Sequence, residues 1–240
     1  MGKIDLPRDI DAKATLRAIE KRRCELSLSE FIKRAWHVVE PGQPFVDNWH
    51  IDMICAHLEA ITDDHVLEDG TCYNRLLVNV PPGTMKSMIV NIFWPSWEWG
   101  PRNKPHLRYI CAAHQQGLAI RDSTKMRRLV TSDWYQGHWG DRVQLTGDQN
   151  AKTKFENTAT GFREAVAAGS ITGSRGDRVI IDDPHSVEGA NSDAMRASTL
   201  EWFTEAVPTR LNNPKNSAIV VIMQRLHEQD VSGVILESKG

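Results

Sequence analysis

The chain has 240 residues, of which 40% are hydrophobic and 25% charged, and these values exclude collagen-like, coiled-coil and disordered proteins. A formal net charge of −2 excludes a uniformly basic nucleic-acid-binding protein, although a local basic patch is compatible with it. The amino terminus lacks the apolar core of a signal peptide, no apolar run could cross a membrane, and the four cysteines form no CxxC pair. We therefore expect an intracellular protein with reduced core thiols and no zinc site.

The amino-terminal part is predicted to be helical. Apolar residues recur at three- and four-residue spacing over residues 14–35, and a turn at Pro41-Gly42 ends this pattern. A second helical pattern runs from Trp49 to Ile61 and stops at the acidic segment 63–69. We expect a single domain over residues 1–240, with a helical amino-terminal extension or lid at 1–43 and the core at 44–240.

Four short apolar runs predict strands. They lie at residues 75–80, 108–113, 178–182 and 218–223, and each is followed by a turn signal or a helical pattern. Continuous apolar runs are typical of strands that are buried on both faces. Helical patterns follow at 86–99, 116–130 and 192–206. This alternation predicts an α/β fold with a mainly parallel central sheet flanked by helices.

A strand, a tight turn and a helix meet in the segment VNVPPGTMKSMIV (78–90). A phosphate-binding loop needs this context, because backbone N–H groups at a helix N-terminus can face phosphates. Lys86 would contact the terminal phosphates and the Ser87 hydroxyl would bind Mg²⁺. The match to GxxxxGKS is imperfect, since Val80 and Met85 replace its glycines and Gly83 is the only glycine in the loop. By itself, the PPG turn is equally compatible with a structural role.

Two acids follow a buried strand further along the chain. Asp182 and Asp183 end the run RVIIDD, 96 residues after Lys86 (182 − 86 = 96). A nucleotide-hydrolysing site needs one carboxylate to hold Mg²⁺ and a second to orient the attacking water. The acids alone could form a surface turn before Pro184. Together with the loop, they indicate a nucleotide site.

Several longer strings resemble one family. VPPGTMKS, DQNAKTKFENTATGFREA (148–165), GSITGSRGDRVIIDDPHS (169–186) and VIMQRLHEQD (221–230) are similar to motifs of the large terminase subunit of tailed bacteriophages, as is the helix at 44–60. The resemblance covers most of residues 44–236 and corresponds to the amino-terminal ATPase half. It implies a P-loop NTPase of the helicase/RecA-like (ASCE) type. Such a motor hydrolyses ATP to move double-stranded DNA into the procapsid.

The resemblance also implies roles for matching positions. ATP would bind at Pro82, Gly83, Thr84, Met85, Lys86 and Ser87, with Trp49 and His50 near the adenine, and Mg²⁺ at Ser87 and Asp182. Trp49 and His50 could equally sit on a packed helix start. Lys86, Asp183 and Arg175 would be catalytic, with Asp183 or else Glu188 activating water. Arg175 would reach a neighbouring subunit's γ-phosphate, or would form a surface pair, and Gln224 would couple hydrolysis to DNA movement.

Partners and alternatives follow from the same resemblance. It implies sequence-independent binding of double-stranded DNA, contacts with a portal protein and a small terminase subunit, and a ring that is pentameric on the portal, in the host cytoplasm. Candidate DNA contacts are His114, Gln115 and Gln116, which could instead form an ordinary turn, and Lys125, Arg127 and Arg128. We expect no carboxyl-terminal nuclease domain and no nuclease activity in these residues. The alternatives are a non-hydrolysing nucleotide-binding scaffold and another P-loop enzyme such as a kinase.

Overall fold

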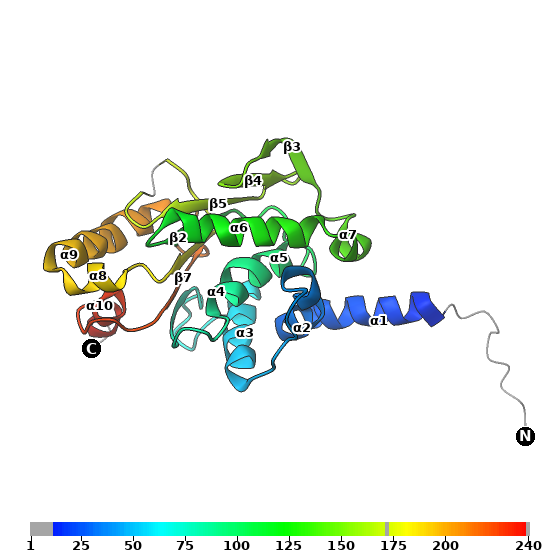
Figure 1. Ribbon diagram of the computed structural model, residues 1–240, viewed down its shortest axis with the longest axis horizontal. Helices are drawn as coiled ribbons and strands as arrows, with labels where there is room; N and C mark the ends of the chain where they lie inside the picture. Colours follow the sequence, from blue (N-terminus) through cyan, green and yellow to red (C-terminus); the bar gives the residue numbers. More distant parts are fainter. Residues whose placement is uncertain (1–11, 171–172, 239–240) are drawn as a thin grey trace, which may run out of the picture.

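The computed structural model describes residues 12–170 and 173–238 (Figure 1). Three helices precede the sheet, namely α1 (Ala12–Leu26), α2 (Leu28–Val39) and α3 (Trp49–Thr62). The helical pattern over residues 14–35 is therefore divided between α1 and α2. It is interrupted at Ser27, whose side chain accepts a hydrogen bond from the N–H of Glu30 and caps α2. Helix α1 projects from the body of the molecule (Figure 1), which leaves Leu16 and Ile19 exposed.

A seven-stranded sheet forms the centre of the fold, in the order β1-β7-β6-β2-β5-β4-β3. The first five strands in this order are parallel, and β5, β4 and β3 pair antiparallel. Their bounds are β1 (Arg75–Asn79), β2 (Tyr109–Ala113), β3 (Leu145–Asn150), β4 (Lys154–Asn157), β5 (Phe162–Ala167), β6 (Arg178–Asp182) and β7 (Ala218–Met223). The predicted mainly parallel α/β sheet is confirmed, and the four apolar runs are β1, β2, β6 and β7.

Helices cover both faces of the sheet. Those that follow β1 in the chain are α4 (Lys86–Met88), the π-helical η1 (Ile89–Phe93), α5 (Trp94–Trp99), α6 (Gln116–Thr131), α7 (Asp133–Trp139), α8 (Val187–Asn191), α9 (Asp193–Glu201), the π-helical η2 (Trp202–Ala206), the 3-10 helix η3 (Val207–Arg210) and α10 (Val231–Glu237). Cys111, Ile180 and Val220 share one core with α2, α3, η1, α5 and α6. Ile110 and Ile181, which point the opposite way, pack with η2, η3 and α10.

A buried ion pair connects β6 to α5. Arg178, at the start of β6, donates to Glu98 from Nη2 at 2.9 Å and from Nε at 3.2 Å, and the Tyr109 hydroxyl also donates to Glu98. Glu98 is 0% exposed. Burial of a carboxylate is tolerated here because every donor reaches it in good geometry. These hydrogen bonds hold β6 against α5 and β2 and so help to fix the position of the strand that ends at Asp182.

The cysteines form no disulfide among the described residues, and most of them are buried in the core. The four cysteines are free, with Cys24, Cys55 and Cys111 buried and Cys72 half-buried. Burial raises the pKa of Cys111 to about 11, so this thiol stays protonated and unreactive near neutral pH. Over residues 12–170 and 173–238, no helix combines the length and apolar character that crossing a bilayer would need.

Candidate nucleotide-binding site

The loop between β1 and α4 turns sharply. Gly83 has a φ of 81° and Met85 a φ of 59°, so two positions of this loop are left-handed. Met85 stands where the phosphate-loop motif has its last glycine, and a residue with a Cβ there costs about 1–2 kcal/mol of backbone strain. The Thr84 hydroxyl donates to the Pro81 carbonyl at 2.8 Å and holds the turn closed. The structure therefore keeps the glycine conformation of the motif without its glycine.

Lys86 begins the helix that follows this loop. Its side chain is buried, and Nζ donates to Oδ1 of Asp183 at 2.7 Å. Asp183 comes from the end of β6, 97 residues away in sequence. The lysine of the loop and the second acid of the strand thus meet at the edge of the sheet.

Asp183 joins the ends of three parallel strands. Its φ is 42°, and its N–H donates to the Ile222 carbonyl in β7 at 2.9 Å. The same carboxylate oxygen that binds Lys86 accepts the N–H of Gln224 at 2.9 Å. The Asp183 carbonyl accepts the backbone N–H of His114 at 3.3 Å, and the His114 ring Nδ1 lies 3.0 Å from it. Left-handed backbone at an aspartate persists only where neighbours fix it, as they do here.

Asp182 is the last residue of β6, directly before Asp183, and is 7% exposed. Its Oδ2 accepts a hydrogen bond from the Asn91 amide at 3.0 Å, while its buried Oδ1 has no partner in the described chain. Burial raises the pKa of Asp182 to about 7, and the neighbouring Asp183 adds to this, whereas the Ser87 hydroxyl and the Lys86 ammonium oppose it. The unpartnered Oδ1 is therefore open to a further ligand.

A magnesium ion fits these residues. An unpartnered buried carboxylate oxygen beside a serine hydroxyl is an oxygen donor set of the kind that Mg²⁺ prefers. Within residues 12–170 and 173–238, no group of three or more His, Cys, Asp or Glu side chains could form a metal site. An ion here would therefore take its other ligands from water and from a bound phosphate, as Mg²⁺ commonly does.

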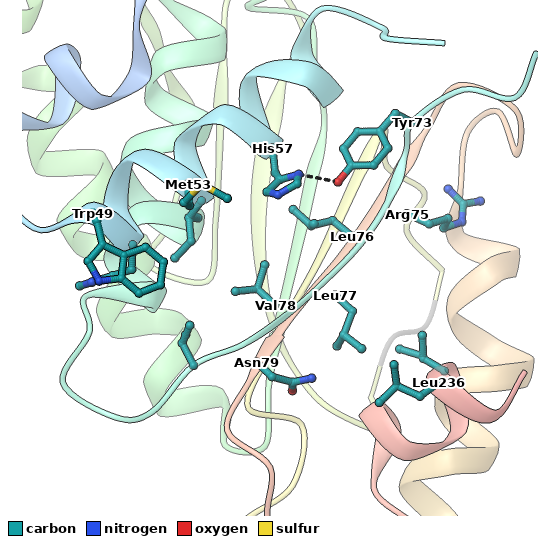
Figure 2. Close-up of a pocket in the computed structure, with 14 residues that line it drawn as sticks. Trp49, Met53, His57, Tyr73, Arg75, Leu76, Leu77, Val78, Asn79 and Leu236 are labelled. Carbon is teal, nitrogen blue, oxygen red and sulfur yellow. Dashed lines mark hydrogen bonds between the residues drawn. The ribbon is translucent and has the colours of Figure 1, made fainter. Parts of the chain in front are cut away.

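His50 brings the start of α3 to the phosphate loop. Its Nε2 lies 3.1 Å from the Thr84 carbonyl. A pocket of about 440 Å³ opens between them, with His50, Gly83 and Met85 among its lining residues. Trp49 is 75% exposed and instead lines a second pocket, of about 540 Å³, along the free edge of β1 (Figure 2). His50 lines this second pocket as well, so the start of α3 borders both pockets.

The remaining predicted residues lie outside this cluster. Arg175 is exposed, and residues 171 and 172 of the same string lie outside the described residues. Glu188 is exposed in the first turn of α8, whereas Asp183 is in contact with Lys86. Gln224 enters the site through its backbone N–H. Among the candidate DNA contacts, Lys125 pairs with Glu40.

Other predicted positions have clear structural roles. Gln115 and Gln116 start α6 and are exposed, while Arg127 is half-buried and Arg128 exposed on the same helix. Asp230 caps α10 by accepting the N–H of Gly233 at 2.9 Å. His227 and Glu228 lie in the preceding loop.

Sequence reasoning missed Asn91. The residue is 3% exposed and contacts Asp182 from the helix that follows the phosphate loop. Its spacing was an available signal, because Asn91 lies four residues after Ser87 and therefore on the same helix face. A buried asparagine in an otherwise apolar helical run needs a hydrogen-bond partner, and the acid at the end of β6 is that partner.

The fold is similar to solved structures of other proteins. No family model and no curated protein matches the chain. The crystal structure of the HK97 bacteriophage large terminase superposes with a TM-score of 0.57 at 13% identity, and the match covers 89% of this chain and 40% of that one. An arginine-to-alanine mutant of the large terminase ATPase domain of Thermus phage P74-26 matches with a TM-score of 0.42 at 14% identity, covering 63% and 60%. The chain spans about 40% of the HK97 protein's length, and over that span it has the fold of that large terminase.

Proposed function

We propose that this chain is the ATPase motor of a large terminase, which hydrolyses ATP to move double-stranded DNA into a viral procapsid. The observation that carries the proposal is the contact between Lys86 and Asp183 at the carboxyl edge of the parallel strands, with the unpartnered Oδ1 of Asp182 beside it. The likeness to the HK97 fold supports the same assignment. A phosphate loop, a strand-end acid pair and this fold together are the components of such a motor.

ATP would occupy the loop from Pro82 to Ser87. The backbone N–H groups of the loop would bind phosphate oxygens, and Lys86 would leave Asp183 to contact the terminal phosphates. Asp183 would then be free to accept a proton from the attacking water. The adenine ring of ATP would enter the pocket lined by His50, Gly83 and Met85, because this pocket adjoins the phosphate loop.

Magnesium would be held by Ser87 and Asp182. When bound, it neutralises charge on the phosphates during transfer. Ser87 is the second residue of α4, so its hydroxyl faces the same space as the free carboxylate oxygen. The chain's own contribution is to keep that oxygen free of protein donors, so that an ion can take it.

DNA would be held through its phosphates without sequence preference, and the binding would weaken with salt. Of the three basic candidates on α6, Arg128 is exposed, whereas Arg127 is half-buried and Lys125 is paired with Glu40. Arg175 would complete the site of a neighbouring subunit in a ring. The portal protein, a small terminase subunit and the host cytoplasm complete the setting that we propose.

The test is phosphate release from ATP by the purified chain, with Mg²⁺, with and without double-stranded DNA. We expect hydrolysis that DNA stimulates, and we expect Lys86→Ala to reduce it by at least about 100-fold, because charge stabilisation of the transferred phosphate is lost. Lys33→Ala is the matched control. Its ammonium also makes a 2.7 Å ion pair, but with Asp47 and not with an acid of the candidate site, so this variant should retain activity.

Two results would refute the proposal. Nucleotide binding without any hydrolysis, even at high protein concentration with DNA, would identify a scaffold. Consumption of ATP that depends on a small acceptor molecule and ignores DNA would identify a kinase. Equal loss of activity in the Lys86 and Lys33 variants would show that the assay reports folding rather than the site.

A further inference from the structure

The helix that carries Lys86 and Ser87 changes from α-helical to π-helical winding at Ile89. In η1 the N–H of Trp94 donates to the carbonyl of Ile89, five residues earlier, which is a π-helical turn. Asn91 lies at the centre of this turn. Single π-turns inside α-helices are rare, and they occur frequently at functional sites.

The turn directs Asn91 at one oxygen of Asp182. The amide nitrogen lies 3.0 Å from Oδ2, and both side chains are buried. Since Oδ2 is held, rotation of the carboxylate is restricted, and Oδ1 is left buried without a protein partner. Ser87 approaches the same carboxylate from one helical turn earlier. One helix face therefore supplies both a hydroxyl and an amide to a single acid.

An amide suits this position better than a charged donor. It adds no charge next to Asp182, so the acid remains the nearest anion for a cation to bind. Lys86, the cation of the site, is engaged with Asp183 and not with Asp182 in the hydrogen bonds of the described residues. Residues that hydrogen-bond a metal ligand orient it, and their loss commonly costs 10- to 100-fold in metal affinity or activity.

We propose that Asn91 is a positioning residue that holds Oδ2 of Asp182 and so aims Oδ1 at the divalent cation that accompanies the nucleotide. The proposal rests on the function proposed above. It assigns the π-helical turn a purpose, because a regular helix would carry residue 91 at a different angle to the sheet.

A purely structural role for Asn91 makes a different prediction. If the amide only satisfied a buried carboxylate, its loss would lower the melting temperature and leave metal affinity unchanged. The test therefore measures both. The probe is Mn²⁺ in place of Mg²⁺, detected by the electron paramagnetic resonance of free Mn²⁺, with the full chain and ADP; ADP affinity and melting temperature are measured separately in EDTA.

Asn91→Leu keeps the size of the side chain and removes its donor. We expect Mn²⁺ affinity of the ADP complex to fall 10- to 100-fold, with ADP affinity in EDTA within about threefold of the unchanged chain. Asn91→Ser, whose hydroxyl cannot reach Oδ2, should act in the same direction if Asn91→Leu does not fold. The control is Asn74→Leu, which removes another buried amide, bonded to the Lys215 carbonyl, and should leave Mn²⁺ affinity unchanged.

A double variant tests whether Asn91 acts through Asp182. In an Asp182→Asn background, Asn91→Leu should cause no further loss of Mn²⁺ affinity, because the oxygen that it positions no longer carries charge. Mn²⁺ affinity within threefold of the unchanged chain in the folded Asn91 variants overturns the proposal while leaving the ATPase assignment intact. Failure of the unchanged chain to bind Mn²⁺ with ADP overturns both.

Discussion

Asp183→Asn separates nucleotide binding from hydrolysis. Asparagine tolerates the left-handed backbone at φ 42° and keeps the oxygen that accepts the Gln224 N–H, so the variant removes charge and little else. In the nucleotide-free chain, Lys86 is bound to Asp183 at 2.7 Å, and the side chains are 6% and 26% exposed. A pair at this depth contributes about 1–2 kcal/mol, which an incoming phosphate must replace.

The expected result is opposite in sign for the two measurements. ATP affinity should rise about 5- to 30-fold, because Lys86 no longer has to leave a carboxylate. Turnover should fall about 100- to 10,000-fold, because the group that accepts the proton of water is gone. Fluorescent-nucleotide titration and phosphate release measure these two quantities. Glu188→Gln is the matched control and should change neither, since Glu188 is exposed on α8. Turnover of Asp183→Asn within about threefold of the unchanged chain would refute the role of Asp183.

Two further predictions concern the assembly and α10. Arg175→Ala should abolish the rise in specific ATPase activity with protein concentration while leaving ATP affinity unchanged; a dilute chain that already has full activity would contradict action between subunits. Asp230 is desolvated, but the N–H groups of Gly233, Leu226 and His227 and the Arg225 guanidinium hold its pKa below the usual value. Its ionised form therefore adds stability that is present above about pH 4 and lost as pH falls through the lowered pKa. Asp230→Asn keeps one acceptor oxygen but loses the charge and the second acceptor, so it should lower the unfolding free energy near pH 7 by about 1–2 kcal/mol, and the difference should shrink below pH 4 in urea titrations.

The strands β2, β6 and β7 were predictable because every residue in them is buried, and a continuous apolar run is typical of such strands. The edge strand β1 was predicted from its central apolar residues, although its ends, Arg75 and Asn79, are exposed. The strands β3, β4 and β5 were not predicted. The residues of β3 and β4 are polar and interrupted, as in LTGDQN, and antiparallel pairing that extends outward from β5 makes them strands.

The site was predictable to the level of residue types. Lys86, Ser87, Asp182 and Asp183 follow strand ends, and parallel strands bring their carboxyl ends to one edge. The contacts among them were not predictable, because they depend on backbone features that no residue type announces. Asp183 is left-handed and Asn91 sits in a π-turn, and both conformations are imposed by neighbouring strands and helices.

The left-handed backbone of Asp183 and the π-turn at Asn91 give the adjacent acids Asp182 and Asp183 different contacts. Asp182 faces inward, toward the phosphate-loop helix, with one oxygen held by Asn91 and the other free for a cation. Asp183 turns the other way, toward Lys86 and the N–H of Gln224. A phosphate that draws Lys86 away from Asp183 would change the charge next to the Gln224 peptide, and Gln224 starts the loop that Asp230 ties to α10. Under the proposed function, the left-handed Asp183 would link the phosphate loop to the segment that follows β7.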